Sequence, residues 1–143
     1  MTLQDLIAKE NVVLNNDFDN WQDAIRFAGN LLIQSGCINQ TYCEDMIKAV
    51  KEYGPYIVIM PGIALAHARP NGNVSVNQIA LVSMPKGVDF GNSQNDPVHF
   101  LFAIAACTDK EHMMIFKTLA SFLSVEENLK ALQTATCFDD IGF

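Results

Sequence analysis

Apolar residues recur at helical spacing in the first third of the chain. One run places its apolar side chains three and four residues apart, which predicts an amphipathic helix that ends at Gly36, where no Cβ opposes a left-handed turn. The apolar positions of this helix are Trp21, Ala24, Ile25, Ala28, Leu31 and Leu32. A second helix is predicted to begin with a capping box at Thr41–Glu44 and to stop near Gly54–Pro55. Residues 3–9 predict a shorter helix, and residues 12–14 predict a brief strand.

Strand-length apolar runs fill the middle of the chain. They predict strands over residues 56–60, 63–65, 76–84 and 99–107. The last two runs are almost entirely apolar, which indicates strands buried on both faces of a sheet that helices cover on either side. Residues 85–97 lie between these two runs, begin and end with proline, and predict a long irregular loop of the kind that often binds a ligand.

Two more helices are predicted in the last third of the chain. Asp109 is the expected cap of a helix whose apolar positions extend to Leu123, and Ser124–Glu127 form the expected capping box of a final helix through Leu132. Helices at both ends and strands in the middle predict an α/β fold, a three-layer α/β/α sandwich with a mixed, mostly parallel central sheet flanked by helices. No repeat or linker divides the chain, so residues 1–143 are expected to form a single domain.

Composition and charge narrow the classes of function. Half of the 143 residues are apolar and 17% are charged, which is typical of a globular protein. The formal net charge of −7 argues against nucleic-acid binding, because phosphate backbones are bound by clustered Lys and Arg. The same charge leaves room for a partner with a basic docking face. The chain has no apolar stretch of membrane-spanning length and no signal-peptide pattern, so we expect no membrane insertion and a cytoplasmic location.

His67 is the first candidate for chemistry. It stands in the apolar run Met60–Pro70, and Arg69 follows it by two residues. Imidazole is a nucleophile and a base near neutral pH, and a guanidinium is the usual partner of a phosphoryl or carboxylate oxygen. Pro61 and Gly62 break the strand before His67, which favours a side chain presented at a rim. Two alternatives remain open: His67 as a structural histidine bonded to the backbone, and Arg69 as a surface cation paired with a carboxylate.

The other two histidines are weaker candidates. His112 lies in the first turn of the helix predicted after Asp109, where free N–H groups and the helix dipole favour an anion. If this helix start faces His67, His112 becomes the second histidine of a phosphoryl site; otherwise it is a solvated helix residue. His99, at the beginning of an apolar strand, is expected to be a structural residue or a donor at a rim.

Other chemical motifs are missing from the sequence. No G-x-x-x-x-G-K-[ST], G-x-G-x-x-G or G-x-S-x-G pattern occurs, so nucleotide binding and serine hydrolysis lack their motifs. The spacing of the three histidines fits no familiar zinc pattern. The cysteines are scattered without a C-x-x-C pair, which favours buried or incidental thiols over a metal site or a disulfide framework. They are Cys37, Cys43, Cys107 and Cys137.

The segment Tyr53–Pro70 carries a family resemblance. It closely resembles the active-site segment of enzyme IIA components of the phosphoenolpyruvate-dependent sugar phosphotransferase system, in the mannitol/fructose-type superfamily and most nearly its ascorbate-specific branch. Asp109–Met114 is similar to that family's helix start with its second histidine. The resemblance extends over essentially the whole chain, and the segment around His67 is its specific part.

This resemblance implies a phosphoryl carrier and therefore a phosphotransferase. His67 would accept a phosphoryl group at Nε2 from the phosphocarrier protein HPr, and phospho-His67 would pass it to a cysteine of the enzyme IIB component. Transport of the sugar, by this resemblance L-ascorbate, would follow through the membrane permease IIC. Arg69 would neutralise phosphoryl charge, and His112 would hydrogen-bond the phosphoryl group or hold the His67 ring. The resemblance implies no cofactor, neither a metal ion nor a nucleotide.

The sequence departs from the family pattern at one position. The residue before the active histidine is usually proline in this family, and here it is Ala66. An alanine frees φ and restores a backbone N–H, so we expect a less constrained approach to the histidine. A second interpretation therefore stays open, in which phospho-His67 of a regulatory module with the same fold controls a partner protein and does not feed a transporter.

Overall fold

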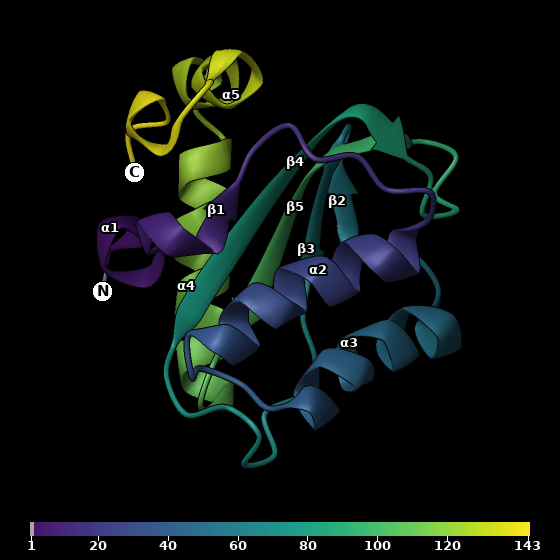
Figure 1. Cartoon of the computed structure of the whole chain (residues 1–143), viewed down its shortest axis with the longest axis vertical. Helices are drawn as coiled ribbons and strands as arrows, with labels where there is room; N and C mark the ends of the chain where they lie inside the picture. Colours follow the sequence, from purple (N-terminus) through teal and green to yellow (C-terminus); the bar gives the residue numbers. More distant parts are fainter. Residues whose placement is uncertain (1) are drawn as a thin grey trace.

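Five strands form one mixed sheet in the order β1-β4-β5-β3-β2 (Figure 1). The structure is a computed structural model and describes residues 2–143. The strands are β1 (Val12–Val13), β2 (Val58–Met60), β3 (Ile63–Ala66), β4 (Gln78–Val88) and β5 (Val98–Ala105). Each of the predicted strands is thus confirmed, with boundaries that shift by a few residues.

Strand directions correct one part of the predicted fold. β1 pairs with β4 and β3 with β5 in parallel, whereas β2 pairs with β3 and β4 with β5 in antiparallel fashion. The sheet is therefore mixed, as predicted, but the expectation of a mostly parallel sheet is wrong. The reason is connection length: Pro61–Gly62 and residues 89–97 are too short to carry a crossover, so the strands that they join form hairpins.

Helices cover both faces of this sheet and confirm the three-layer α/β/α arrangement (Figure 1). Helices α2 and α3 pack on one face, while α4, the short α1 and α5 pack on the other. Short 3₁₀ turns follow α1 and α5, and the helix predicted over residues 3–9 ends already at Leu6. The helices are α1 (Leu3–Leu6), α2 (Trp21–Gln34), α3 (Gln40–Tyr53), α4 (Asp109–Leu123) and α5 (Glu126–Thr134); the 3₁₀ turns are Lys9–Asn11 and Phe138–Asp140.

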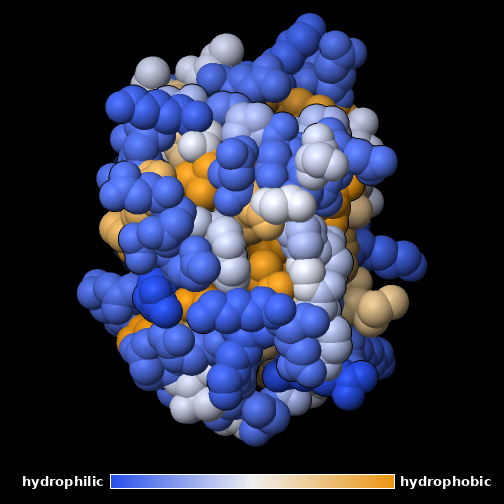
Figure 2. All heavy atoms as spheres, turned by 90° about the vertical axis from the view of Figure 1, so that its right-hand side faces the viewer, coloured by the Kyte–Doolittle hydropathy of each residue, from blue (hydrophilic) through white to orange (hydrophobic). Residues whose placement is uncertain are grey.

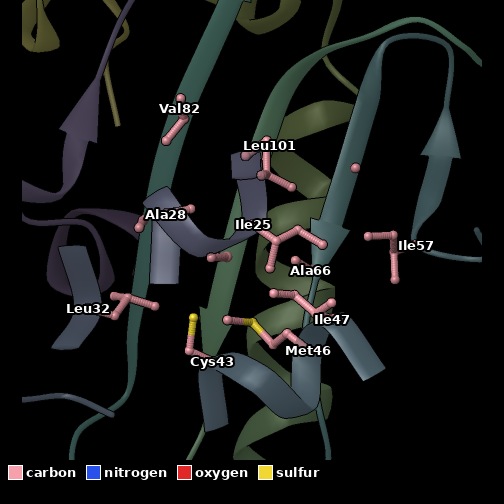
Figure 3. Close-up of a cluster of buried hydrophobic side chains, with 14 of the residues drawn as sticks. Ile25, Ala28, Leu32, Cys43, Met46, Ile47, Ile57, Ala66, Val82 and Leu101 are labelled. Atoms are coloured by element: carbon pink, nitrogen blue, oxygen red, sulfur yellow. The ribbon is translucent and has the colours of Figure 1, made fainter. Parts of the chain in front are cut away.

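Side chains alternate between the two faces of the central strands. On β3, Ala64 and Ala66 join the core beneath α2 and α3, and Ile63 and Leu65 join the core beneath α4. Figure 3 shows the first of these cores, in which residues of α2 and α3 meet the sheet. Because successive side chains of a strand point to opposite faces, the next odd-numbered residue, His67, is directed toward the α4 side.

The helix caps differ from the predicted ones. The cap of α3 is Asn39, two residues before the predicted Thr41, and the cap of α4 is Thr108, one residue before Asp109. Both cap residues have extended backbones, and each side chain accepts a backbone N–H from three residues further on. The capping box predicted for the last helix does not form, because Val125 occupies the cap position.

Strand β4 is longer than predicted and shortens the irregular segment that follows it. Pro85 lies inside β4 because the register with β5 shifts between Ser83 and Val88, and such a bulge tolerates a residue without an N–H. The remaining loop, residues 89–97, is held by Asp96, whose carboxylate accepts three backbone N–H groups. The predicted long irregular loop over residues 85–97 is therefore a strand end followed by a short ordered turn.

The outer surface is mainly polar. In Figure 2, hydrophilic side chains dominate the face that corresponds to the right-hand side of Figure 1, and apolar atoms appear there as small patches among them. None of the helices within residues 2–143 has the length and apolar character needed to cross a bilayer.

Candidate functional site

His67 directly follows the last residue of β3, at the end of a strand that is buried in the sheet. Its Nδ1 lies 2.7 Å from the carbonyl oxygen of Leu65. Since a carbonyl oxygen only accepts, Nδ1 carries the hydrogen and donates it. Nε2 then keeps its lone pair, makes no hydrogen bond within the described chain and, in contrast to His112 Nε2, is not buried. The backbone contact thus fixes the tautomer that presents Nε2 as a nucleophile.

The surroundings of His67 also hold the ring in its neutral form. Burial of the half-buried imidazole lowers the pKa of His67 below its ordinary value of 6.5, and the hydrogen bond to Leu65 opposes this effect only in part. A neutral imidazole is the nucleophilic form, because protonation would occupy the Nε2 lone pair. The backbone hydrogen bond of a structural histidine is therefore compatible with a nucleophilic Nε2.

His112 lies next to His67, as the sequence analysis required for a two-histidine site. It occupies the first turn of α4, and the two ring centroids are 5.1 Å apart. β5 leads directly into α4, and β3 is the parallel neighbour of β5, so both histidines lie at the same end of the sheet (lower end in Figure 1). Burial and the neighbouring His67 lower the pKa of His112, and Asp109 opposes them. Its Nε2 is buried and has no hydrogen-bond partner within the described chain.

Two aromatic rings that the sequence analysis missed complete the surroundings of His67. Phe116 stands edge-on to both histidines, with ring centroids 4.8 Å from His67 and 4.7 Å from His112. Tyr56 stands edge-on to His67 at 5.5 Å. Phe116 could have been found, since it follows His112 by four residues on one helical face. Tyr56 could also have been found, since a hairpin of the strands predicted over residues 56–60 and 63–65 brings its ring beside the histidine.

A cleft of about 860 Å³ opens over His67 and His112 and is lined by side chains of both charges. The cations are Lys48 of α3 and Arg69, which is exposed. Within residues 2–143, no carboxylate lies within salt-bridge distance of Arg69, so the paired surface cation considered above is not observed. The carboxylates of the lining are Asp45, Glu52 and Asp109.

Large apolar side chains are exposed along the rim of the cleft. Tyr53 and Met113 are each 71% exposed, and Tyr56 is 46% exposed. Side chains of this size, left uncovered around a concave site, are typical of a surface that another protein covers. Within the described residues, no group of three His, Cys, Asp or Glu side chains is arranged to hold a metal ion.

His99 lies at the opposite end of the sheet. It is near the start of β5, and its Nδ1 is 3.0 Å from the carbonyl oxygen of Met84 on the neighbouring β4. A Cβ built on Gly87 would lie 3.0 Å from the ring. His99 also lines a second cavity, of about 380 Å³, beneath α5. The structure therefore does not bring His99 together with His67 and His112.

Comparison with known proteins identifies relatives over almost the whole chain. Residues 5–142 match the family model described as the phosphoenolpyruvate-dependent sugar phosphotransferase system, EIIA 2. An ascorbate-specific PTS system EIIA component of Shigella boydii is 31% identical over 135 residues, which cover 93% of this chain and 88% of the relative.

Solved structures agree with this assignment. The mannitol-specific cryptic phosphotransferase enzyme IIA CmtB of Escherichia coli superposes with a TM-score of 0.87 at 26% identity, covering 99% of this chain and 95% of that one. Enzyme IIAMTL of Escherichia coli, in its complex with phosphorylated enzyme IIBMTL, gives a TM-score of 0.84 at 25% identity, covering 95% of both chains.

Proposed function

The chain belongs to the EIIA type 2 family of the phosphoenolpyruvate-dependent sugar phosphotransferase system and is a phosphotransferase, and on that premise we propose that His67 is its phosphoryl-accepting residue. The observation that carries the proposal is the pairing of two imidazoles at one cleft: the ring centroid of His112 is 5.1 Å from that of His67, and the buried Nε2 of His112 has no hydrogen-bond partner within the described chain. The hydrogen bond from His67 Nδ1 to the Leu65 carbonyl leaves the lone pair of His67 Nε2 available to this cleft. We take residues 1–143 as a single domain with this one relay site.

Phosphoryl transfer to His67 requires no external base, because the attacking nitrogen of the neutral ring carries no proton. The donor is the phosphohistidine of the phosphocarrier protein HPr. As Nε2 of neutral His67 attacks phosphorus, the new P–N bond forms, the donor P–N bond breaks, and its electron pair returns to the donor imidazole. Positive charge then develops on the His67 ring, and the Leu65 carbonyl stabilises it through the Nδ1–H. In the next step a cysteine sulfur of enzyme IIB attacks phosphorus, and His67 leaves as neutral imidazole.

His112 and Arg69 are the proposed partners of the phosphoryl oxygens. The buried Nε2 of His112 has no hydrogen-bond partner within the described chain, and an N–H at this position would meet a phosphoryl group on His67. Arg69 and Lys48 supply positive charge to the same cleft. Catalysis by such groups depends mainly on position and electrostatics, as in other phosphoryl transfers.

Protein partners fit the shape of the site better than small molecules do. The reactive nitrogen lies at the base of an open cleft, and the exposed rings of Tyr53 and Tyr56 with the Met113 side chain offer apolar contact around it. We propose HPr as the donor and a cognate enzyme IIB as the acceptor; the related Escherichia coli IIAMTL is known in complex with phosphorylated IIBMTL. We further propose the cytoplasm as the place of action, because phosphoenolpyruvate is a cytoplasmic metabolite.

The proposed sugar is L-ascorbate. Support comes from the ascorbate-specific components of Shigella boydii and Escherichia coli, which are 31% and 30% identical to this chain. The membrane permease IIC would complete the transport step and would act on this chain only through IIB.

A pulse and chase of labelled phosphoryl groups tests this function. The protein is first loaded from labelled phosphoenolpyruvate by enzyme I and HPr, freed of these carriers, and then mixed with the IIB of an ascorbate system. We expect the wild-type protein to take up the label during loading through HPr. After mixing, the label should move to IIB within seconds. A IIB whose active cysteine is replaced by serine is the matched control and should receive none. Label that stays on the protein with every IIB tested would contradict the transport role and favour the regulatory one.

A further inference from the structure

Tyr42 is a buried tyrosine whose hydroxyl lies beside the backbone of the His67 segment. It belongs to the first turns of α3 and is completely buried. Its hydroxyl oxygen is 2.6 Å from the carbonyl oxygen of Ile104 in β5 and 3.2 Å from the backbone nitrogen of Ala68. Burial raises the pKa of Tyr42 to about 12, so the hydroxyl keeps its proton at all working pH values. It therefore donates to Ile104 and accepts from Ala68.

These two hydrogen bonds continue the sheet beyond the end of β3. The ladder between β3 and β5 ends at the pair Ala66 and Ala103. One step further, the chain leaves the sheet, and the Tyr42 hydroxyl bridges the gap between Ala68 and Ile104. The Ala68 N–H belongs to the peptide bond that follows His67, so this bridge fixes the backbone on the carboxyl side of the histidine.

The position of Tyr42 is itself fixed by contacts at the start of α3. The Asn39 side chain caps the helix by accepting the Tyr42 N–H at 3.0 Å. Asn39 also contacts Asn73 twice, through its backbone N–H at 3.2 Å and through its side-chain amide at 3.0 Å. The segment after His67 is thus tied to the beginning of α3 at two places, and the hydroxyl of Tyr42 has little freedom to move.

We propose that Tyr42 is a positioning residue for His67, which holds the backbone so that Nδ1 reaches the Leu65 carbonyl and Nε2 faces the cleft. The proposal rests on the proposed role of His67.

The variant Tyr42→Phe tests the proposal, because it removes one oxygen atom and keeps the ring in the core. Imidazole nitrogen NMR should show the Nδ1–H tautomer of His67 in the wild type and a mixture with the Nε2–H tautomer in the variant. In the relay assay, kcat should fall roughly tenfold to hundredfold, while KM for phosphorylated HPr changes less than about twofold. Ile25→Val, a small deletion on α2 in the same core, is the control for lost stability and should change neither readout.

Two further results keep the test decisive. If Tyr42→Phe does not fold, hydrogen exchange of the backbone amides in the wild-type protein tests the proposal instead. The Ala68 amide should then exchange as slowly as the amides of β5. An Ala68 amide that exchanges at the rate of an open loop, or a folded Tyr42→Phe protein with the wild-type tautomer and kcat, would overturn the proposal. The NMR and exchange measurements need no phosphoryl donor. If the proposed function is wrong, the wild-type protein stays unphosphorylated in the relay assay, and this result is distinguishable from a failure of the Tyr42 proposal.

Discussion

The two ends of the sheet carry histidines with the same hydrogen bond and different surroundings. His67 donates from Nδ1 to Leu65 at 2.7 Å, and His99 makes the corresponding contact to Met84 at 3.0 Å. In both rings Nδ1 therefore carries a hydrogen and donates it to the backbone. A bond from Nδ1 to a backbone carbonyl is common to both ends and does not by itself distinguish a reactive histidine.

What distinguishes His67 is the group of side chains around it. His112 stands beside it, and Arg69 and Lys48 line the same cleft. The ring of His99 instead lies close to Gly87 and lines a cavity to which the chain contributes no Lys or Arg side chain within residues 2–143. We infer that a second imidazole and nearby cations set the proposed phosphoryl site apart, because a bound anion requires such groups and a structural histidine does not.

Exchange of each histidine for glutamine gives the largest expected difference between the two ends. His67→Gln should abolish phosphoryl acceptance from HPr, because the amide nitrogen has no lone pair to attack phosphorus. His99→Gln should keep the rate within about threefold of the wild type, since the residue lies outside the site. Gel separation of phosphorylated and unphosphorylated protein over time measures both. Equal loss in the two variants would show that the ends do not differ in function.

Removal of the second imidazole separates the roles of the two histidines in the cleft. His112→Ala should slow acceptance by about 100-fold and leave His67 modifiable, because a positioned donor is lost while the nucleophile stays. His112→Gln retains an N–H near the same place and should recover part of the rate. Rapid-quench measurement of the first transfer provides the numbers. Complete loss of modification in His112→Ala would mean that the two histidines have been ranked in the wrong order.

At the His99 end of the sheet, a substitution at Gly87 is expected to change the stability of the protein and not its phosphoryl transfer. Gly87 has φ of +75°, and an added Cβ would lie 2.7 Å from Pro97 and 3.0 Å from His99. Gly87→Ala should therefore lower the free energy of unfolding by about 1–3 kcal/mol through overpacking in addition to backbone strain. Gly36→Ala, with a similar φ of +77° and no atom within 4 Å of the added Cβ, isolates the strain. Urea unfolding measures stability, and transfer per folded molecule should stay unchanged in both variants.

The pH dependence of stability is the smallest effect and belongs to the His67 end. Burial lowers the pKa of His67 and of His112 in the folded protein, whereas both take up protons near 6.5 once unfolded. Below pH 6.5 the unfolded state binds more protons, so stability falls with falling pH until the folded-state pKa values are passed. Urea midpoints between pH 8 and pH 5 test this. The double variant His67→Gln/His112→Gln should show a flatter profile, and an unchanged slope would contradict the assignment.

Much of the fold follows from local patterns in the sequence. The apolar spacing around Ile25 and Leu32 identified α2 within one residue of its true start, and the apolar runs located β4 and β5. Strand direction was harder, because it depends on whether a connection can hold a crossover, and the extension of β4 through Pro85 disguised the length of the loop. The caps were missed because Asn39 and Thr108 lie within two residues of Thr41 and Asp109, whose side chains are equally able to cap a helix.

The candidate site was predictable only in part. His67 could be selected from its own segment, and His112 only on the condition that its helix faced the strand end. Tyr42 carried no signal, because its hydroxyl contacts Ala68 and Ile104, which are distant from it in the chain. A tyrosine on an apolar helical face predicts burial, but the identity of the backbone groups that its hydroxyl meets is a property of the tertiary structure.

The most direct test of the central claim is to locate the phosphorus atom on the phosphorylated protein. Nitrogen-15-labelled protein is loaded through enzyme I and HPr, and the coupling between phosphorus and the imidazole nitrogens is recorded by NMR. We expect one phosphoryl group, bound to Nε2 of His67, with Nδ1 still protonated and hydrogen-bonded to the Leu65 carbonyl. Phosphorus on His67 Nδ1, or on His112 or His99, would contradict it.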